Sequence, residues 1–101
     1  MSAVHGFRVE REDYTATLAR QLAELNRQID VLELRLKAAS ADTRECLAGE
    51  LVLLRRQSGE AAEKYRELRA TGDEGWDQVL AEMERLRSAF VRTFSYFKTQ
   101  L

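Results

Sequence analysis

The chain has 101 residues and no proline, with 33% charged and 45% hydrophobic residues. Its 16 basic and 17 acidic residues are interspersed and leave a net charge of −1, so we expect no nucleic-acid binding, which needs a basic excess. The single cysteine, Cys46, excludes an internal disulfide. A composition rich in Leu, Ala, Glu and Arg is typical of long helices or coiled coil.

After a tail at residues 1–10, the first predicted helix covers about residues 11–39. Its apolar residues alternate in steps of four and three, which places them in one narrow stripe, as in the seam of a coiled coil. The stripe consists of Tyr14, Leu18, Leu22, Leu25, Ile29, Leu32, Leu36 and Ala39.

A break in this repeat follows, because the next core position would fall one residue before Leu47. A straight helix would therefore rotate its apolar stripe by about 100° here. Ser40 or Asp42 can cap a new helix, and Asp42 with Glu45 has the spacing of a capping box. We expect a hairpin that turns at 39–42; a continuous rod with a skip residue is the alternative.

The second predicted helix covers about residues 43–70. Its seam contains Leu47, Leu51, Leu54, Ser58, Ala61, Tyr65 and Leu68. The small residues Ser58, Gly59 and Ala62 at its centre would let a ring or a backbone approach closely. Since Gly59 costs about 1 kcal/mol of helix propensity relative to alanine, we expect a packing benefit there.

The third predicted helix covers about residues 74–99 and follows "RATGDEGW". In this stretch Gly72 can close the preceding helix in the left-handed conformation. Asp73 can cap the new helix, and Thr71 with Glu74 has capping-box spacing. The helix places large apolar residues seven apart, at Trp76, Met83, Phe90 and Phe97.

Three amphipathic segments of similar length with short connections predict an all-α fold in a single domain. We expect an antiparallel three-helix bundle or coiled coil, or an oligomer in which these helices are intertwined. The predicted core is Leu18, Leu22, Leu25, Ile29, Leu32, Leu36, Leu47, Leu51, Leu54, Tyr65, Leu68, Trp76, Met83 and Phe90.

The C-terminal stretch "FVRTFSYFKTQL" concentrates aromatic residues and has three interpretations. The rings are core, or they form a partner-binding surface, or they contact a membrane surface beside Arg92 and Lys98. The candidate partner-binding residues are Phe90, Val91, Phe94, Tyr96, Phe97 and Leu101.

Catalytic, metal-binding and cofactor-binding patterns were sought, and none is assigned. His5 is the only histidine, and no Glu-x-x-His pair or glycine-rich phosphate loop occurs. Cys46 lies near a predicted helix start, where a thiol can become reactive, so a redox-linked dimer is an alternative to a residue at the margin of the bundle. We therefore expect a protein that is not an enzyme.

The layout resembles a family of short bacterial coiled-coil proteins, some of which are stress-response proteins. Tyr14 opens the leucine-seamed helix, the second helix ends in "YRELRATGDEGW", and the third is built around Trp76, Leu80, Leu86, Phe90 and Phe97. The resemblance implies a non-enzymatic cytoplasmic helical protein.

Together these patterns predict a scaffold or protein-interaction module that associates with itself and with another protein. Its N-terminus lacks the apolar core of a signal peptide, and its longest aliphatic run, "LVLL" at 51–54, is too short to span a membrane. We expect a cytoplasmic protein; the alternative function is peripheral binding to a membrane or lipid surface through the third helix.

Overall fold

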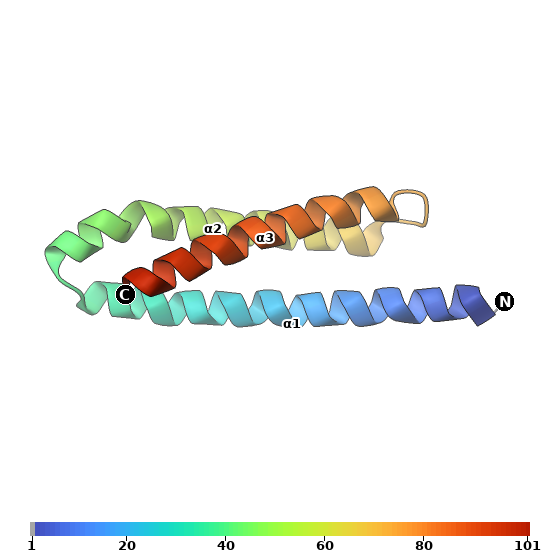
Figure 1. The fold of residues 1–101 in the computed structure, drawn as a ribbon, viewed down its shortest axis with the longest axis horizontal. Coiled ribbons are helices and arrows are strands. Elements are labelled where there is room, and N and C mark those ends of the chain that lie inside the picture. The colour runs from blue at the N-terminus through green and yellow to red at the C-terminus, as the bar shows by residue number, and fades with distance from the viewer. Residues whose placement is uncertain (1) are drawn as a thin grey trace.

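The computed structural model describes the backbone of residues 2–101 and the side chains of residues 10–101. The chain forms three helices, α1 (Ser2–Ala38), α2 (Ala41–Ala70) and α3 (Trp76–Gln100). Each helix runs back along the one before it, in a bundle that measures 61 × 18 × 17 Å (Figure 1). The predicted all-α three-helix bundle is confirmed.

Helix α1 begins at Ser2, so it includes the segment that was predicted to be a tail. Nothing in that segment stops a helix, because the chain lacks proline and contains only Gly6 as a weak helix former there.

Helix α3 packs more extensively against α2 than against α1. Helix α2 therefore lies between the other two in the packing, and α1 depends mainly on α2.

The core is entirely apolar among the residues whose side chains are described. Helix α2 contributes one buried residue in every seven, whereas α3 contributes a wide face of aromatic and aliphatic side chains. The buried residues are Leu18, Leu22, Ile29, Leu32, Leu36, Leu47, Leu54, Ala61, Leu68, Trp76, Val79, Met83, Phe90, Phe94 and Phe97. Of the predicted core, only Leu25, Leu51 and Tyr65 are partly exposed, and all three pack against it.

The connection between α1 and α2 is the expected hairpin turn. Ser40 is the N-cap of α2, and its hydroxyl accepts a hydrogen bond from the N–H of Thr43 at 3.2 Å. Of the two predicted caps, Ser40 and Asp42, Ser40 is therefore the one that caps α2. Asp42 lies instead in the first turn of α2, where its charge complements the helix dipole.

The connection between α2 and α3 differs from the prediction. None of the described glycines has a positive φ, so the left-handed closure expected at Gly72 is wrong. Helix α2 ends at Ala70, before the extended residue Thr71, whose hydroxyl donates to the carbonyl of Glu67 at 2.6 Å. Thr71 and Glu74 form no capping box for α3, because that helix begins only at Trp76.

Helix α3 also begins later than predicted, at Trp76 after the cap residue Gly75. Asp73 does not cap it, because the cap position is Gly75, two residues later. The Asp73 carboxylate instead accepts a hydrogen bond from Arg11 of α1 at 2.6 Å.

Gly59 gives no close approach, contrary to expectation. A Cβ atom built there would meet no other atom within 4 Å, and the residue is exposed. Ala61 is instead the small residue that α2 buries.

Candidate functional site

The aromatic residues of the C-terminal stretch divide into buried rings and exposed neighbours. Phe90 and Phe97 have no exposed surface, and Phe94 is 7% exposed. These three rings form core contacts within the single chain. The rings that a membrane surface or a partner would bind are thus turned inward, toward α1 and α2.

Val91, Tyr96 and Leu101 remain exposed, but they do not form one patch. Val91 and Tyr96 lie five residues apart, which places them about 140° apart round the helix. Tyr96 lines a shallow hollow of about 360 Å³ with Cys46 and Leu47 of α2, on one side of α3. The candidate partner-binding residues are therefore distributed between the core and separate sides of α3.

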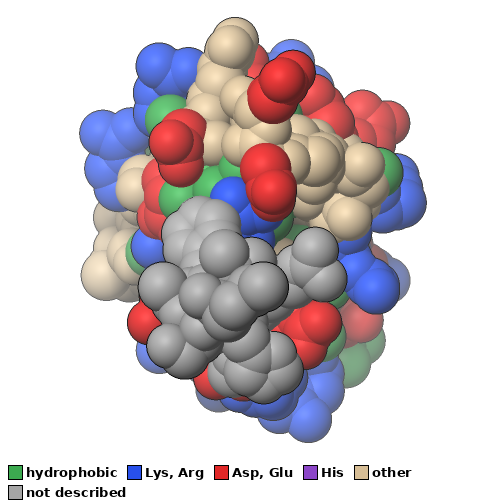
Figure 2. All heavy atoms as spheres, turned by 90° about the vertical axis from the view of Figure 1, so that its right-hand side faces the viewer, with side chains coloured by type: hydrophobic (Ala, Val, Ile, Leu, Met, Phe, Trp, Pro, Cys, Tyr) green, Lys and Arg blue, Asp and Glu red, His purple; other side chains and the backbone are tan. Residues whose placement is uncertain are grey.

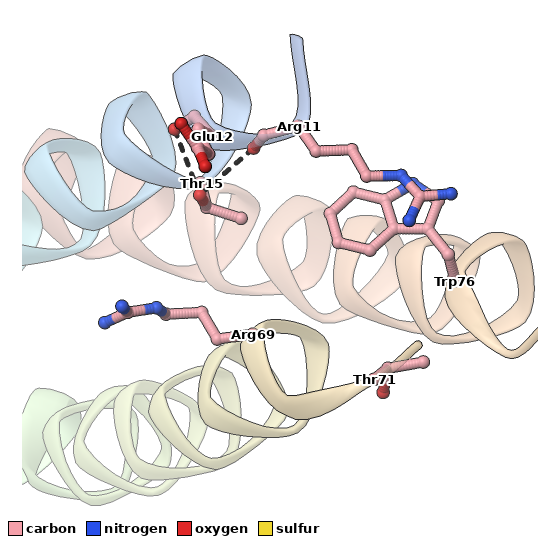
Figure 3. A pocket seen from close by; sticks show the side chains of 6 residues that line it. All are labelled: Arg11, Glu12, Thr15, Arg69, Thr71 and Trp76. Atoms are coloured by element: carbon pink, nitrogen blue, oxygen red, sulfur yellow. Dashed lines mark hydrogen bonds between the residues drawn. The ribbon is translucent and has the colours of Figure 1, made fainter. Parts of the chain in front are cut away.

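A hollow of about 310 Å³ lies at the other end of the bundle, where α1 meets the turn between α2 and α3 (Figure 3). The Arg11 guanidinium lies over the Trp76 ring, 4.6 Å from its centroid, and also bonds Asp73. A guanidinium over an indole contributes about 0.5–2 kcal/mol, depending on its exposure. Arg11 therefore fastens α1 to the start of α3.

The other polar groups of this hollow serve the helices themselves. The Thr15 hydroxyl donates to the carbonyls of Arg11 and Glu12, at 3.0 Å each. Arg69 extends away from Trp76 and has the ring of Tyr65 6.0 Å from its guanidinium carbon (Figure 3). Figure 2, a view onto this end, shows charged side chains of both signs around its rim. We interpret the hollow as a structural clamp rather than a ligand site.

Polar contacts across the α1–α2 hairpin fix its register. Arg55 of α2 donates to Asp30 and Glu33 of α1, at 2.9 and 3.3 Å. These contacts raise the pKa of the Arg55 guanidinium, chiefly through the hydrogen bond to Asp30. Further along the hairpin, the Ser58 hydroxyl donates to the side-chain oxygen of Asn26.

This register places exposed apolar residues at one level of the hairpin. Leu34 is 66% exposed and Val52 is 69% exposed, the two highest values among the large hydrophobic residues described. Counting four residues onward from Asp30 and four back from Arg55 brings Leu34 level with Leu51, the neighbour of Val52. Leu34 and Val52 therefore lie at similar levels along α1 and α2.

A hollow of about 380 Å³ lies between the two helices at this level, and Leu36, Ala48 and Leu51 give it an apolar lining. Leu34 and Val52 do not line this hollow, because each follows a lining residue, Glu33 or Leu51, by one position and points about 100° away from it round its helix. We call this surface the hairpin face and define it by these residues: Asp30, Glu33, Leu34 and Lys37 on α1, and Arg44, Ala48, Leu51, Val52 and Arg55 on α2.

The hairpin face is on the opposite side of α1 and α2 from α3. Gln21 accepts a hydrogen bond from Arg87 of α3 at 3.3 Å, and Lys64 donates to Glu82 of α3 at 3.4 Å. Gln21 precedes Asp30 by nine residues, and Lys64 follows Arg55 by nine. Nine residues correspond to about 180° round a helix, so Asp30 and Arg55 point away from α3. This face is uncovered in the single chain.

The sequence pattern did not identify this face. Leu34 and Val52 fall outside the leucine seams, among charged residues, where single apolar residues are common and need no explanation. Their distances from the hairpin turn give no signal either, because Leu34 lies six residues before Ser40 and Val52 lies twelve residues after it.

The described residues contain no cluster of three or more His, Cys, Asp or Glu side chains that could hold a metal ion. Likewise, within the part of the chain that the structure describes, no helix is long and apolar enough to cross a membrane. The Cys46 thiol is exposed and free, and the side chain of His5 lies outside the described residues. Comparisons with protein-family models, curated proteins and solved structures find no match to the chain.

Proposed function

We propose that this chain is a non-enzymatic helical scaffold that associates with itself through the hairpin face. The observation that carries the proposal is the exposure of Leu34 and Val52, at 66% and 69%, on the two helices that also line an apolar hollow. Fully burying a leucine or valine contributes about 1.5–3 kcal/mol. A two-fold interface uses each residue twice, so four such side chains would leave water.

The remaining features support a scaffold rather than a catalyst. The buried side chains that the structure describes are all apolar, whereas a catalytic site needs polar groups held in place in a cleft. The free Cys46 suits a reducing compartment, and we include a cytoplasmic location in the proposal.

Size-exclusion chromatography with light scattering tests the proposal on three proteins. These are the wild-type chain, Leu34→Glu on the hairpin face, and Tyr96→Glu on α3. Tyr96 is the matched control because it is also exposed, at 52%, but lies on another helix. We expect the wild type and Tyr96→Glu to be dimers and Leu34→Glu to be a folded monomer.

Two outcomes contradict the proposal. A wild-type monomer at all concentrations would refute self-association. Dissociation by Tyr96→Glu, with Leu34→Glu still dimeric, would move the interface to the C-terminal helix. Circular dichroism of each variant confirms that loss of assembly is not loss of folding.

A further inference from the structure

We infer that the turn between α1 and α2 has a second, open state, in which the two helices join into one and α1 is exchanged with a second copy of the chain. The contacts that α1 makes inside one chain then form between two chains. This inference goes beyond the proposed function, because the exchange does not use the hairpin face.

The turn departs from a continuous helix over two residues only. Helix α1 ends at Ala38 and α2 begins at Ala41, which leaves Ala39 and Ser40 between them. Ser40 has a φ of −63° and a ψ of 158°. Its φ is already that of an α-helix, in which ψ is about −42°. At Ser40 the difference between the hairpin and a continuous helix therefore lies in ψ alone.

No residue near the turn prevents a continuous helix. Neither glycine nor proline occurs between Gly6 and Gly49, and none of the described residues has a positive φ. The turn sequence "KAASADTRE" at 37–45 contains three alanines, and alanine is the strongest helix former. The local preference of the chain is thus to continue the helix through the turn.

The apolar seam also continues through the turn. Among the described residues, Leu36 is the last buried residue of α1 and Leu47 is the first of α2. Eleven residues separate them, which corresponds to three full helical turns and about 20°. The larger rotation expected from the repeat through Ala39 does not apply to these two buried residues. One continuous helix would therefore carry both seams on nearly the same side.

Two side chains hold the turn closed by replacing main-chain hydrogen bonds. The Ser40 hydroxyl accepts a hydrogen bond from the N–H of Thr43 at 3.2 Å. The Arg44 guanidinium donates to the carbonyls of Lys37 and Ala39. In a continuous helix, the N–H groups four residues further on would donate to those carbonyls instead. The closed turn therefore depends on Ser40 and Arg44, whereas the open state needs neither side chain.

An open chain needs a second copy, because opening uncovers the buried side of α1. Helix α3 stays on α2, against which it packs more extensively than against α1. The groove that α1 leaves on α2 and α3 fits α1 of a second chain, since the same contacts form again between chains. They include the ion pair of Arg11 with Asp73 and the hydrogen bond between Ser58 and Asn26. Such an exchange of identical elements is domain swapping.

The closed state prevails at ordinary concentrations because the turn tethers α1 to its own groove. A short linker gives an effective concentration in the millimolar range, with which a second copy has to compete. Loss of the cap hydroxyl in Ser40→Ala weakens each closed turn about fivefold. Since the swapped dimer contains two open turns, we expect Ser40→Ala to raise its association constant about 25-fold.

Ala41→Pro is the matched control, because it fits the hairpin but blocks the continuous helix. Ala41 is the first residue of α2, a position at which proline is common. A following proline also favours the extended conformation that Ser40 already has. In a continuous helix the same proline would lie in the interior and would disfavour the open state more than a hundredfold per turn.

Two spin labels in one chain distinguish the closed from the open state. We place them at Arg27→Cys on α1 and Gly59→Cys on α2. The side chain of Arg27 is 74% exposed, and a Cβ at Gly59 would meet no atom within 4 Å. The hydrogen bond between Ser58 and Asn26 puts the two sites at one level of the hairpin. They are 32 residues apart in the chain.

All labelled proteins carry Cys46→Ser, which removes the exposed native thiol, and Leu34→Glu, which removes association through the hairpin face. Each is unfolded in urea and refolded at high micromolar concentration with an excess of the unlabelled, cysteine-free chain of otherwise the same sequence. Double electron–electron resonance then measures the separation within one chain. Light scattering gives the mass, and circular dichroism confirms that each protein is helical.

With Ser40 retained, we expect a single-chain mass and a separation close to the bundle width of 18 Å. With Ser40→Ala, we expect a dimer in which the labels are about 48 Å apart, because 32 residues at 1.5 Å each then separate them in one helix. Adding Ala41→Pro to Ser40→Ala should restore the single-chain mass and the short separation.

Three results would overturn the inference. The first is a single-chain mass with the short separation for Ser40→Ala, and the second is a dimer of this variant that keeps the short separation. The third is a separation of about 48 Å that persists when Ala41→Pro is added. Because Leu34→Glu is present throughout, none of these results bears on the proposed association through the hairpin face.

Discussion

The end of α3 provides a paired test of what its aromatic residues do, because neighbouring rings have opposite environments. Phe97 has no exposed surface, whereas Tyr96 is 52% exposed. Replacing each by alanine removes a ring of similar size and gives a similar gain in helix propensity, since phenylalanine and tyrosine have similar values. The difference between the two variants therefore reports burial alone.

The expected cost differs several-fold. Phe97→Ala deletes a fully buried ring, for which losses of about 3–5 kcal/mol are typical. We expect the lower end, about 3 kcal/mol, because Phe97 lies in the last turn of α3, which ends at Gln100, and a helix end can relax. Tyr96→Ala should cost no more than about 1 kcal/mol, since exposed substitutions have small effects.

Thermal and urea unfolding followed by circular dichroism at 222 nm measures both variants. At about 4–8 °C per kcal/mol for a domain of this size, Phe97→Ala should lower Tm by at least about 12 °C. All proteins must be compared at one concentration, because association adds to apparent stability. Equal losses for the two variants, or a loss below about 1 kcal/mol for Phe97→Ala, would refute the packing of α3 described here.

Two further outcomes follow from positions on α2. Gly49→Ala should stabilise the fold by about 0.5–1 kcal/mol, since a Cβ there meets nothing within 4 Å. Gly75→Ala is its control, because the new Cβ would lie 2.9 Å from a side-chain atom of Thr71; a thermal melt in which Gly49→Ala gives no gain would contradict the helical geometry. The pKa of Lys64 is raised, chiefly by its hydrogen bond to Glu67. Its contribution to stability is thus present below the unfolded pKa of about 10.4 and lost as pH rises through the folded value. Urea unfolding between pH 9 and 12 should show a shallower loss for Lys64→Met than for the wild type, and equal slopes would contradict this role.

The helices and most of the core could be predicted because their causes are local. Steps of three and four place Leu18 and Ile29 on one side of a helix whatever packs against it. The shift of the repeat before Leu47, with Ser40 available as a cap, was enough to predict the hairpin turn. Such signals need only the periodicity of the helix and the chemistry of its ends.

The errors arose where distant residues compete with local preferences. Asp73 had the position of a helix cap, but Arg11 binds it from another helix. Gly59 was expected to admit a close neighbour, but it faces outward. The sequence does not show directly which sides of α1 and α2 are covered by α3. That missing fact also concealed the hairpin face, since Leu34 becomes an uncovered apolar residue only when α3 is placed on the other side.

Sedimentation equilibrium of the unmodified chain tests the central claim, self-association through a preformed face, most directly. One chain has a mass of 11.6 kDa. We predict a mass of twice that value at high micromolar concentration, which falls toward the single-chain mass on dilution, whereas Leu34→Glu should have the single-chain mass throughout. A single-chain mass at every concentration into the millimolar range would contradict the account.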